Sequence, residues 1–260
     1  MSVPGEREPF FIGWSRSVPP SLLRFCGAVA LVLLALLAGL GLLLGRTVED
    51  PAARLLAFAP AVEVRPEPWA ADRSLKGIVT ADPYPVLHLA PDAAMPFGRA
   101  VLLVGDGKRG ADVAASTTPV EVSGGLLRRG DVAMLVLDGP PRPVAGEPAR
   151  EAPAVQRLGR WRVAGEICDG KCYAGGMRPG SGLSHRACAE LCLLGDVPAI
   201  FVAAMPVAGR QFLVLAAQDG GKPPPALLDL TALPVELEGE VERRGDMLIF
   251  KVDMRHARLL

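Results

Sequence analysis

A run of 21 residues without a charged side chain, Phe25 to Gly45, constrains this chain more than any other feature. As a helix it would extend about 31 Å, which matches the hydrocarbon core of a bilayer. Its leucines, valines and phenylalanine favour insertion by roughly 4 to 7 kcal/mol. The alternatives are a buried helix and a cleaved signal peptide, whose apolar region is usually shorter. The sequence therefore predicts a transmembrane helix over residues 25–45 that embeds the protein in a lipid bilayer.

The charged flanks of this run indicate an orientation. Arg7, Arg16 and Arg24 precede it, whereas Arg46 and Arg54 follow it. Because positive flanks favour the cytoplasmic side, residues 1–24 are predicted to form a cytoplasmic tail. Heavy use of Ala, Arg, Gly and Pro is typical of a bacterial protein. We therefore expect a single-pass protein of the bacterial inner membrane, a signal anchor with a periplasmic C-terminal part.

The composition of the remaining chain indicates a turn-rich β protein. There are 29 glycines and 25 prolines, and aromatic residues make up only 5%. Basic and acidic residues balance at 28 each, which argues against nucleic acid as a partner. Clusters of proline predict the divisions of the chain. These are a stalk at 46–73, a first β domain at 74–138, a Pro-rich linker at 139–160 and a second β domain at 161–260.

Two parts of the predicted β region resemble each other. Val120–Asp138 and Val235–Asp253 are identical at eight of nineteen positions, and each reads as a strand, an Arg-Arg-Gly-Asp turn and a second strand. Leu75–Val79 and Val163–Ile167 form a second similar pair upstream. We predict a mainly β fold with two small barrels of the oligonucleotide/oligosaccharide-binding type. Two unrelated hairpins are the alternative.

The second half alone contains a Cys-rich insertion, residues 168–192. Its candidate site residues are Cys168, Cys172, His185, Cys188 and Cys192. Ser184 is expected to cap a short helix that ends at Gly195. His185, Cys188 and Cys192 would then share one face of that helix.

Three interpretations of this cluster stay open. Two disulfides would pair the Cys168/Cys172 turn with the helix, as expected in an oxidising compartment. Alternatively, the thiolates and His185 would bind zinc or cuprous copper. The third interpretation is thiol redox chemistry, with His185 activating Cys188 one helical turn away. The neighbouring carboxylates of Glu166, Asp169 and Glu190 are expected to be solvated.

The segment Gly165–Val202 begins GEICDGKCY and continues through HRACAELC. It resembles a family of uncharacterised bacterial membrane-anchored proteins with the pattern GEIxDxKCY…HRACAxLC. The resemblance implies that the four cysteines and His185 act as a set, and it implies no particular ligand. Asp196 stands where the family pattern has a second glycine, which puts the local turn in question.

The sequence does not favour an enzyme. It has three histidines and no phosphate-binding glycine loop, nucleophile elbow or H-E-x-x-H motif, so no catalytic residue is assigned. We expect a membrane-anchored periplasmic binding or accessory module, stabilised by disulfides, that serves a membrane or redox complex. The alternative is a metal-binding or thiol-redox protein that uses the cluster of four cysteines and one histidine. No cofactor is firmly predicted, and zinc and copper are the candidate metals.

Overall fold

The computed structural model describes residues 18–47, 70–90 and 100–260. Its one long helix, α1 (Pro20–Thr47), is apolar and long enough to cross a membrane. The helix begins five residues before the predicted span, at a proline, which fits the first turn because its missing N–H would have no helical partner there. Most of the predicted tail and stalk lies outside the described residues. The described residues from 70 onward form a separate compact unit.

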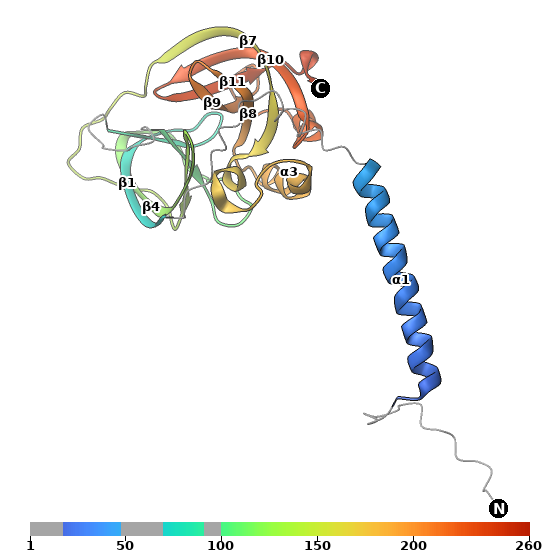
Figure 1. The fold of residues 1–260 in the computed structure, drawn as a ribbon. Helices are drawn as coiled ribbons and strands as arrows, with labels where there is room; N and C mark the ends of the chain where they lie inside the picture. Colours follow the sequence, from blue (N-terminus) through green and yellow to red (C-terminus); the bar gives the residue numbers. More distant parts are fainter. Residues whose placement is uncertain (1–17, 48–69, 91–99) are drawn as a thin grey trace, which may run out of the picture. The chain divides into compact units, whose positions relative to one another are not determined.

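The first part of this unit is a closed five-stranded barrel (Figure 1). Its strands are β1 (Ala70–Thr80), β2 (Val86–Leu89), β3 (Ala100–Val104), β4 (Ser116–Arg129) and β5 (Val132–Leu137). They pair in the order β1-β2-β3-β5-β4, and β4 closes the ring on β1. β3 and β5 are parallel, and the other pairs are antiparallel. A two-residue strand, β6 (Arg142–Pro143), adds to β4.

A second closed barrel repeats this arrangement. Its strands are β7 (Val155–Asp169), β8 (Ala199–Val207), β9 (Arg210–Ala216), β10 (Pro234–Arg244) and β11 (Met247–Val252), and β12 (Arg258–Leu259) adds to β10 as β6 adds to β4. The order is β7-β8-β9-β11-β10, again with one parallel pair, β9 with β11. The prediction of a mainly β fold with two small barrels is confirmed. The second barrel begins at Val155, inside the range expected for the linker.

Glycines mark equivalent positions in the two barrels. The four are Gly77 and Gly124 in the first barrel and Gly165 and Gly239 in the second. At each of them an added Cβ would collide with a carbonyl oxygen of the neighbouring strand, so only glycine fits. These close approaches explain why glycines are among the residues that the two halves share.

The two hairpin turns are also equivalent. β4 and β5 are joined at Gly130, and β10 and β11 at Gly245, with φ of 60° and 61°. This left-handed conformation matches the twist of a two-residue hairpin and is open to glycine at little cost. The Arg-Arg-Gly-Asp turns are therefore where the sequence predicted them.

The barrels share a hydrophobic core. On β3, Val101 and Leu103 point into the first barrel, whereas Ala100, Leu102 and Val104 belong to the cluster that fills the second. Alternation along a strand sends these two sets to opposite faces, so β3 is buried on both sides. The two barrels consequently pack as one body.

The main difference lies in the connection between β7 and β8, residues 170–198. It contains a π-helical turn, η1 (Cys172–Gly176), a 3-10 turn, η2 (Leu183–His185), and the short helix α3 (Arg186–Leu194). The expected helix is present, but the N-cap is His185, and no side chain caps it. The Ser184 prediction is wrong because the 3-10 turn starts before that residue and draws it into helical backbone.

The chain leaves α3 through a tight turn. Asp196 has a φ of 68°, in the left-handed region that favours glycine. Aspartate tolerates this conformation better than most residues with a side chain. The turn after α3 therefore forms without a glycine at this position. Two further 3-10 turns, η3 (Pro225–Leu230) and η4 (Met254–His256), flank β10 and β11.

Candidate metal centre

At the end of β7, the side chains of Cys168 and Asp169 point to opposite faces of the strand. Cys168 and Asp169 still pair with β8, opposite Ile200 and Ala199, so their side chains lie on opposite faces of the strand. The Cys168 thiol is buried and donates to Glu166 Oε1 at 3.3 Å. Burial raises the pKa of Cys168 well above its ordinary value. Cys168 therefore stands apart from the other three cysteines of the insertion.

Asp169 organises the other face. Its Oδ1 accepts the backbone N–H of Cys172 at 2.8 Å, and its Oδ2 lies 3.0 Å from His185 Nε2. The carboxyl group is fully buried, so the expectation that it would be solvated is wrong. A carboxylate at this position accepts the Nε2 proton and leaves Nδ1 as the acceptor of the ring. This is how many metal-binding histidines are oriented.

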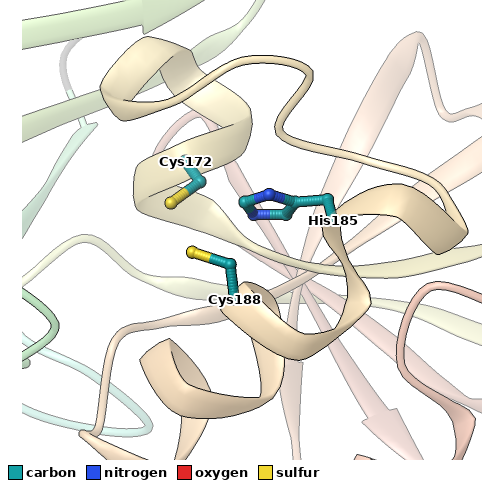
Figure 2. Close-up of side chains that lie close together, drawn as sticks. All are labelled: Cys172, His185 and Cys188. Atoms are coloured by element: carbon teal, nitrogen blue, oxygen red, sulfur yellow. The ribbon is translucent and has the colours of Figure 1, made fainter. Parts of the chain in front are cut away.

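Three cysteines and the histidine converge here. The ligand atoms of Cys172, His185 and Cys188 lie within 4.8 Å of one another, and their side chains face a common point (Figure 2). Asp169, Cys172 and Cys192 form a second such group, which overlaps the first at Cys172. The Sγ atoms of Cys172 and Cys192 are 3.9 Å apart. Of the five residues expected to act as a set, the structure brings together four.

A hydrogen bond between two of these thiols shifts their pKa values in opposite directions. Cys172 and Cys192 share a hydrogen bond that lowers the pKa of Cys192 and raises that of Cys172. Of the two, Cys192 is therefore the thiol that ionises more readily. Both side chains are almost completely buried.

The two disulfides of the first interpretation are not formed among the described residues. All four cysteines of the insertion are free thiols. Cys168 cannot pair with α3 because the strand turns it to the opposite face, and its thiol is used by Glu166. The Sγ atoms of Cys172 and Cys192, at 3.9 Å, are well beyond the bond length of about 2.05 Å.

The first barrel reaches this cluster through the loop after β3, residues 105–110. Lys108 Nζ lies 2.8 Å from Cys188 Sγ and 4.0 Å from Cys192 Sγ. Its hydrogen bond to Cys188 raises the pKa of Lys108. After the hydrogen bond with Cys172, the charge of Lys108 is a further cause that lowers the pKa of Cys192. The site therefore contains a charge that is supplied by the other barrel.

Backbone contacts hold this loop in place. Lys171 Nζ donates to the carbonyls of Gly105 and Gly107 at 2.7 and 2.8 Å. Gly110 donates its N–H to the Gly195 carbonyl at 2.7 Å. A Cβ on Gly195 would collide with the Lys108 carbonyl oxygen, so the two chains touch without side chains between them. Burial lowers the pKa of Lys171, but its two carbonyl partners solvate the ammonium group.

Sequence reasoning missed two neighbours of the cluster. Lys108 is 80 positions from Cys188, and no local pattern links them. Met177 lies in the glycine-rich stretch, and its Sδ is 3.5 Å from Cys188 Sγ. Its position between two cysteine pairs was the one available signal. By contrast, Glu190 pairs with Arg186 at 2.7 Å along α3 and takes no part in the cluster.

The donor set and spacing fit a thiophilic metal ion. Three thiolates and one imidazole are a recognised zinc ligand set, and cuprous copper also favours thiolates. With Zn–S bonds of about 2.3 Å, tetrahedral geometry separates two sulfurs by about 3.8 Å. The 3.9 Å between Cys172 and Cys192 is close to that separation. The buried Asp169 behind His185 completes the arrangement.

A scan against protein-family models gives no match for this chain. Searches of curated proteins and of solved structures likewise give no match. The function is therefore inferred from the geometry of the cluster.

Proposed function

We propose that this protein is a membrane-anchored metal-binding protein whose double barrel holds one soft metal ion, zinc or cuprous copper. The ligands are Cys172, His185, Cys188 and Cys192. The observation that carries the proposal is the convergence of these four side chains within the β7–β8 connection. Such a site would form part of the fold, because the insertion that supplies it packs into the shared core.

The helix α1 supports a location at a membrane, since it is long and apolar enough to span one. The arginine bias of the sequence favours a bacterial inner membrane with the barrels in the periplasm. In that oxidising compartment, free thiols need protection, and coordination would supply it. The protein would then serve a neighbouring membrane or redox complex as a binding or accessory module.

The test is metal stoichiometry in the full-length protein, purified in detergent without chelators. After incubation with excess zinc or with cuprous copper under reducing, anaerobic conditions, the unbound metal is removed and the bound metal is measured. We expect one equivalent per chain for the wild type. Cys172→Ser should lose it, because Cys172 belongs to both groups of ligand atoms.

Cys168→Ala is the matched control, since this cysteine is equally buried but lies on the opposite face of β7. It should keep the full equivalent of metal. Wild-type protein that binds neither metal would contradict the proposal. So would loss of metal from Cys168→Ala with retention in Cys172→Ser.

Thiol redox chemistry is the second candidate, and the Cys172–Cys192 pair favours it. The two sulfurs are 3.9 Å apart, and their shared hydrogen bond makes Cys192 the more readily ionised thiol. Oxidation would release two protons and two electrons to an acceptor and form one disulfide. Alkylation under denaturing conditions, with and without reductant, distinguishes the two. A Cys172–Cys192 disulfide in metal-free protein as isolated would favour redox chemistry or a structural bond, whereas free thiols would favour metal.

A further inference from the structure

Met177 is an exposed methionine held against the candidate metal centre. It follows the π-helical turn η1 directly, and 44% of its surface is exposed. Its Sδ nevertheless lies 3.5 Å from Cys188 Sγ. A thioether at the surface gains little from burial, so its contact with a candidate ligand is the feature that needs an explanation.

The backbone around Met177 is tightly constrained. Gly180 has a φ of 74°, and an added Cβ there would come within 2.5 Å of the Cys172 carbonyl oxygen. The loop therefore folds back over Cys172 in a path that only glycine permits. Glu166 Oε1 accepts the N–H of Gly182 at 2.6 Å and fixes the far end of the same loop. Met177 is thus placed by a defined loop next to the sulfur cluster.

Exposure falls from Met177 toward the interior. Cys188 is partly buried, whereas Cys172, His185 and Cys192 are almost completely buried. Because Met177 contacts Cys188, and Cys188 lies within 4.8 Å of Cys172 and His185, soft donor atoms continue from the surface to the buried ligands. Met177 is the most exposed sulfur of this series.

The chemistry of a thioether separates the two candidate metals. Methionine sulfur is a ligand for cuprous copper, whereas structural zinc is bound by thiolate, imidazole and carboxylate. A methionine in contact with Cys188 favours copper and gives nothing to zinc. We propose that the metal is cuprous copper and that Met177 is its outer ligand, an inference that rests on the proposed function. Met177 would receive the ion at the surface and pass it to Cys188.

The test compares two leucine variants of the full-length protein in detergent, under anaerobic and reducing conditions. Met177→Leu keeps the size and apolar character of the side chain and removes the sulfur. Met205→Leu is the control, because Met205 is also exposed, at 68%, but lies on β8. Cuprous copper is delivered in competition with a coloured bidentate chelator, and zinc in competition with a zinc-sensitive dye.

We expect Met177→Leu to weaken the retention of copper about tenfold, the low end for loss of a supporting group at a metal site. Zinc binding should be unchanged, and Met205→Leu should match the wild type for both metals. Copper retention by Met177→Leu equal to that of the wild type would overturn this inference and leave the proposed metal site standing. A wild type that binds neither metal would overturn the proposed function itself.

Discussion

The two barrels share a strand order but differ in one connection. In the first barrel, β1 and β2 are joined by residues 81–85, and Tyr84 packs into the core of the second barrel. In the second, the equivalent connection runs from 170 to 198 and contains the sulfur cluster. The strand order is unchanged by this insertion. Two barrels of the same strand order thus differ in one loop, and the longer loop carries the candidate site.

The short connection is still a structural part of the second barrel's site. Burial raises the pKa of Tyr84 to about 12, and its hydroxyl group bonds to the backbone of Ala199, the first residue of β8. Residues 105–110 of the same barrel contact both ends of the insertion, because Lys171 donates to the Gly105 and Gly107 carbonyls and Gly110 donates to the Gly195 carbonyl. One barrel carries the ligands, and the other braces both ends of the loop that presents them.

The largest effects should come from the glycines that the barrels have in common. Gly124→Ala and Gly239→Ala each introduce a Cβ that collides with a backbone oxygen of the adjacent strand. We expect each to lower the free energy of unfolding by about 3 kcal/mol or more, measured by chemical denaturation of the full-length protein. Gly139→Ala is the control, because nothing lies near its added Cβ.

The comparison predicts similar losses at the two sites, since Gly124 and Gly239 occupy the same register. A large loss in one variant and none in the other would show that the barrels are not equivalent in strand packing.

The two barrels also differ in a buried histidine, His88, which only the first barrel has at this position. His88 on β2 corresponds to Val202 on β8, because each lies beside the glycine of the adjacent strand. His88 is 7% exposed and bonds to Thr80 Oγ1 at 2.9 Å. Burial lowers its pKa from 6.5 to about 4. In that window the unfolded chain binds a proton that the folded protein does not, so stability falls as the pH falls.

His88→Val copies the second barrel and removes this titration. The wild type should lose up to about 3 kcal/mol between pH 7 and pH 4 from His88 alone. The variant should show a smaller decline, measured as the difference between denaturation midpoints at the two pH values. His256→Gln, at an exposed position, serves as the control. An unchanged pH slope in His88→Val would remove this distinction between the barrels.

The brace between the barrels should have an intermediate effect. Gly195→Ala places a Cβ against the Lys108 carbonyl oxygen, so residues 105–110 must move. We expect a loss of about 2 kcal/mol in stability and faster proteolysis of this loop. Gly139→Ala is again the control. Wild-type stability in Gly195→Ala would mean that the second barrel holds its insertion without the first.

The sequence predicted the repeated parts of this molecule better than the unique ones. The hairpins were visible because strand alternation and the Arg-Arg-Gly-Asp turns are local and occur twice. The short helix was visible, but its start was not, because a 3-10 turn draws Ser184 into helical backbone. The start of β7 at Val155 was hidden by the prolines before it.

The site was predicted only in part, because only some of its residues are linked by a local sequence pattern. His185, Cys188 and Cys192 share a helical face, and that local spacing is visible in sequence. The place of Cys168 depends on β7 continuing to Asp169, since a strand sends adjacent residues to opposite faces. Lys108 comes from the other barrel, and only the packing of the two barrels brings it to the cluster. Long-range contacts of this kind have no signature in a single sequence.

The smallest expected effect tests that last contact. Lys108→Met removes the ammonium group beside Cys188 and keeps most of the aliphatic stem. In the metal-free, reduced protein, the ammonium group donates a hydrogen bond to Cys188 Sγ, and its exposed position limits this contact to about 0.5 to 1 kcal/mol. Alkylation of Cys188, followed by peptide mass spectrometry, should therefore slow about two- to fivefold. Lys76→Met, at an exposed lysine of β1, should leave the rate unchanged. If both variants react like the wild type, the first barrel supports the site by packing alone, and the charge of Lys108 contributes nothing to the chemistry of Cys188.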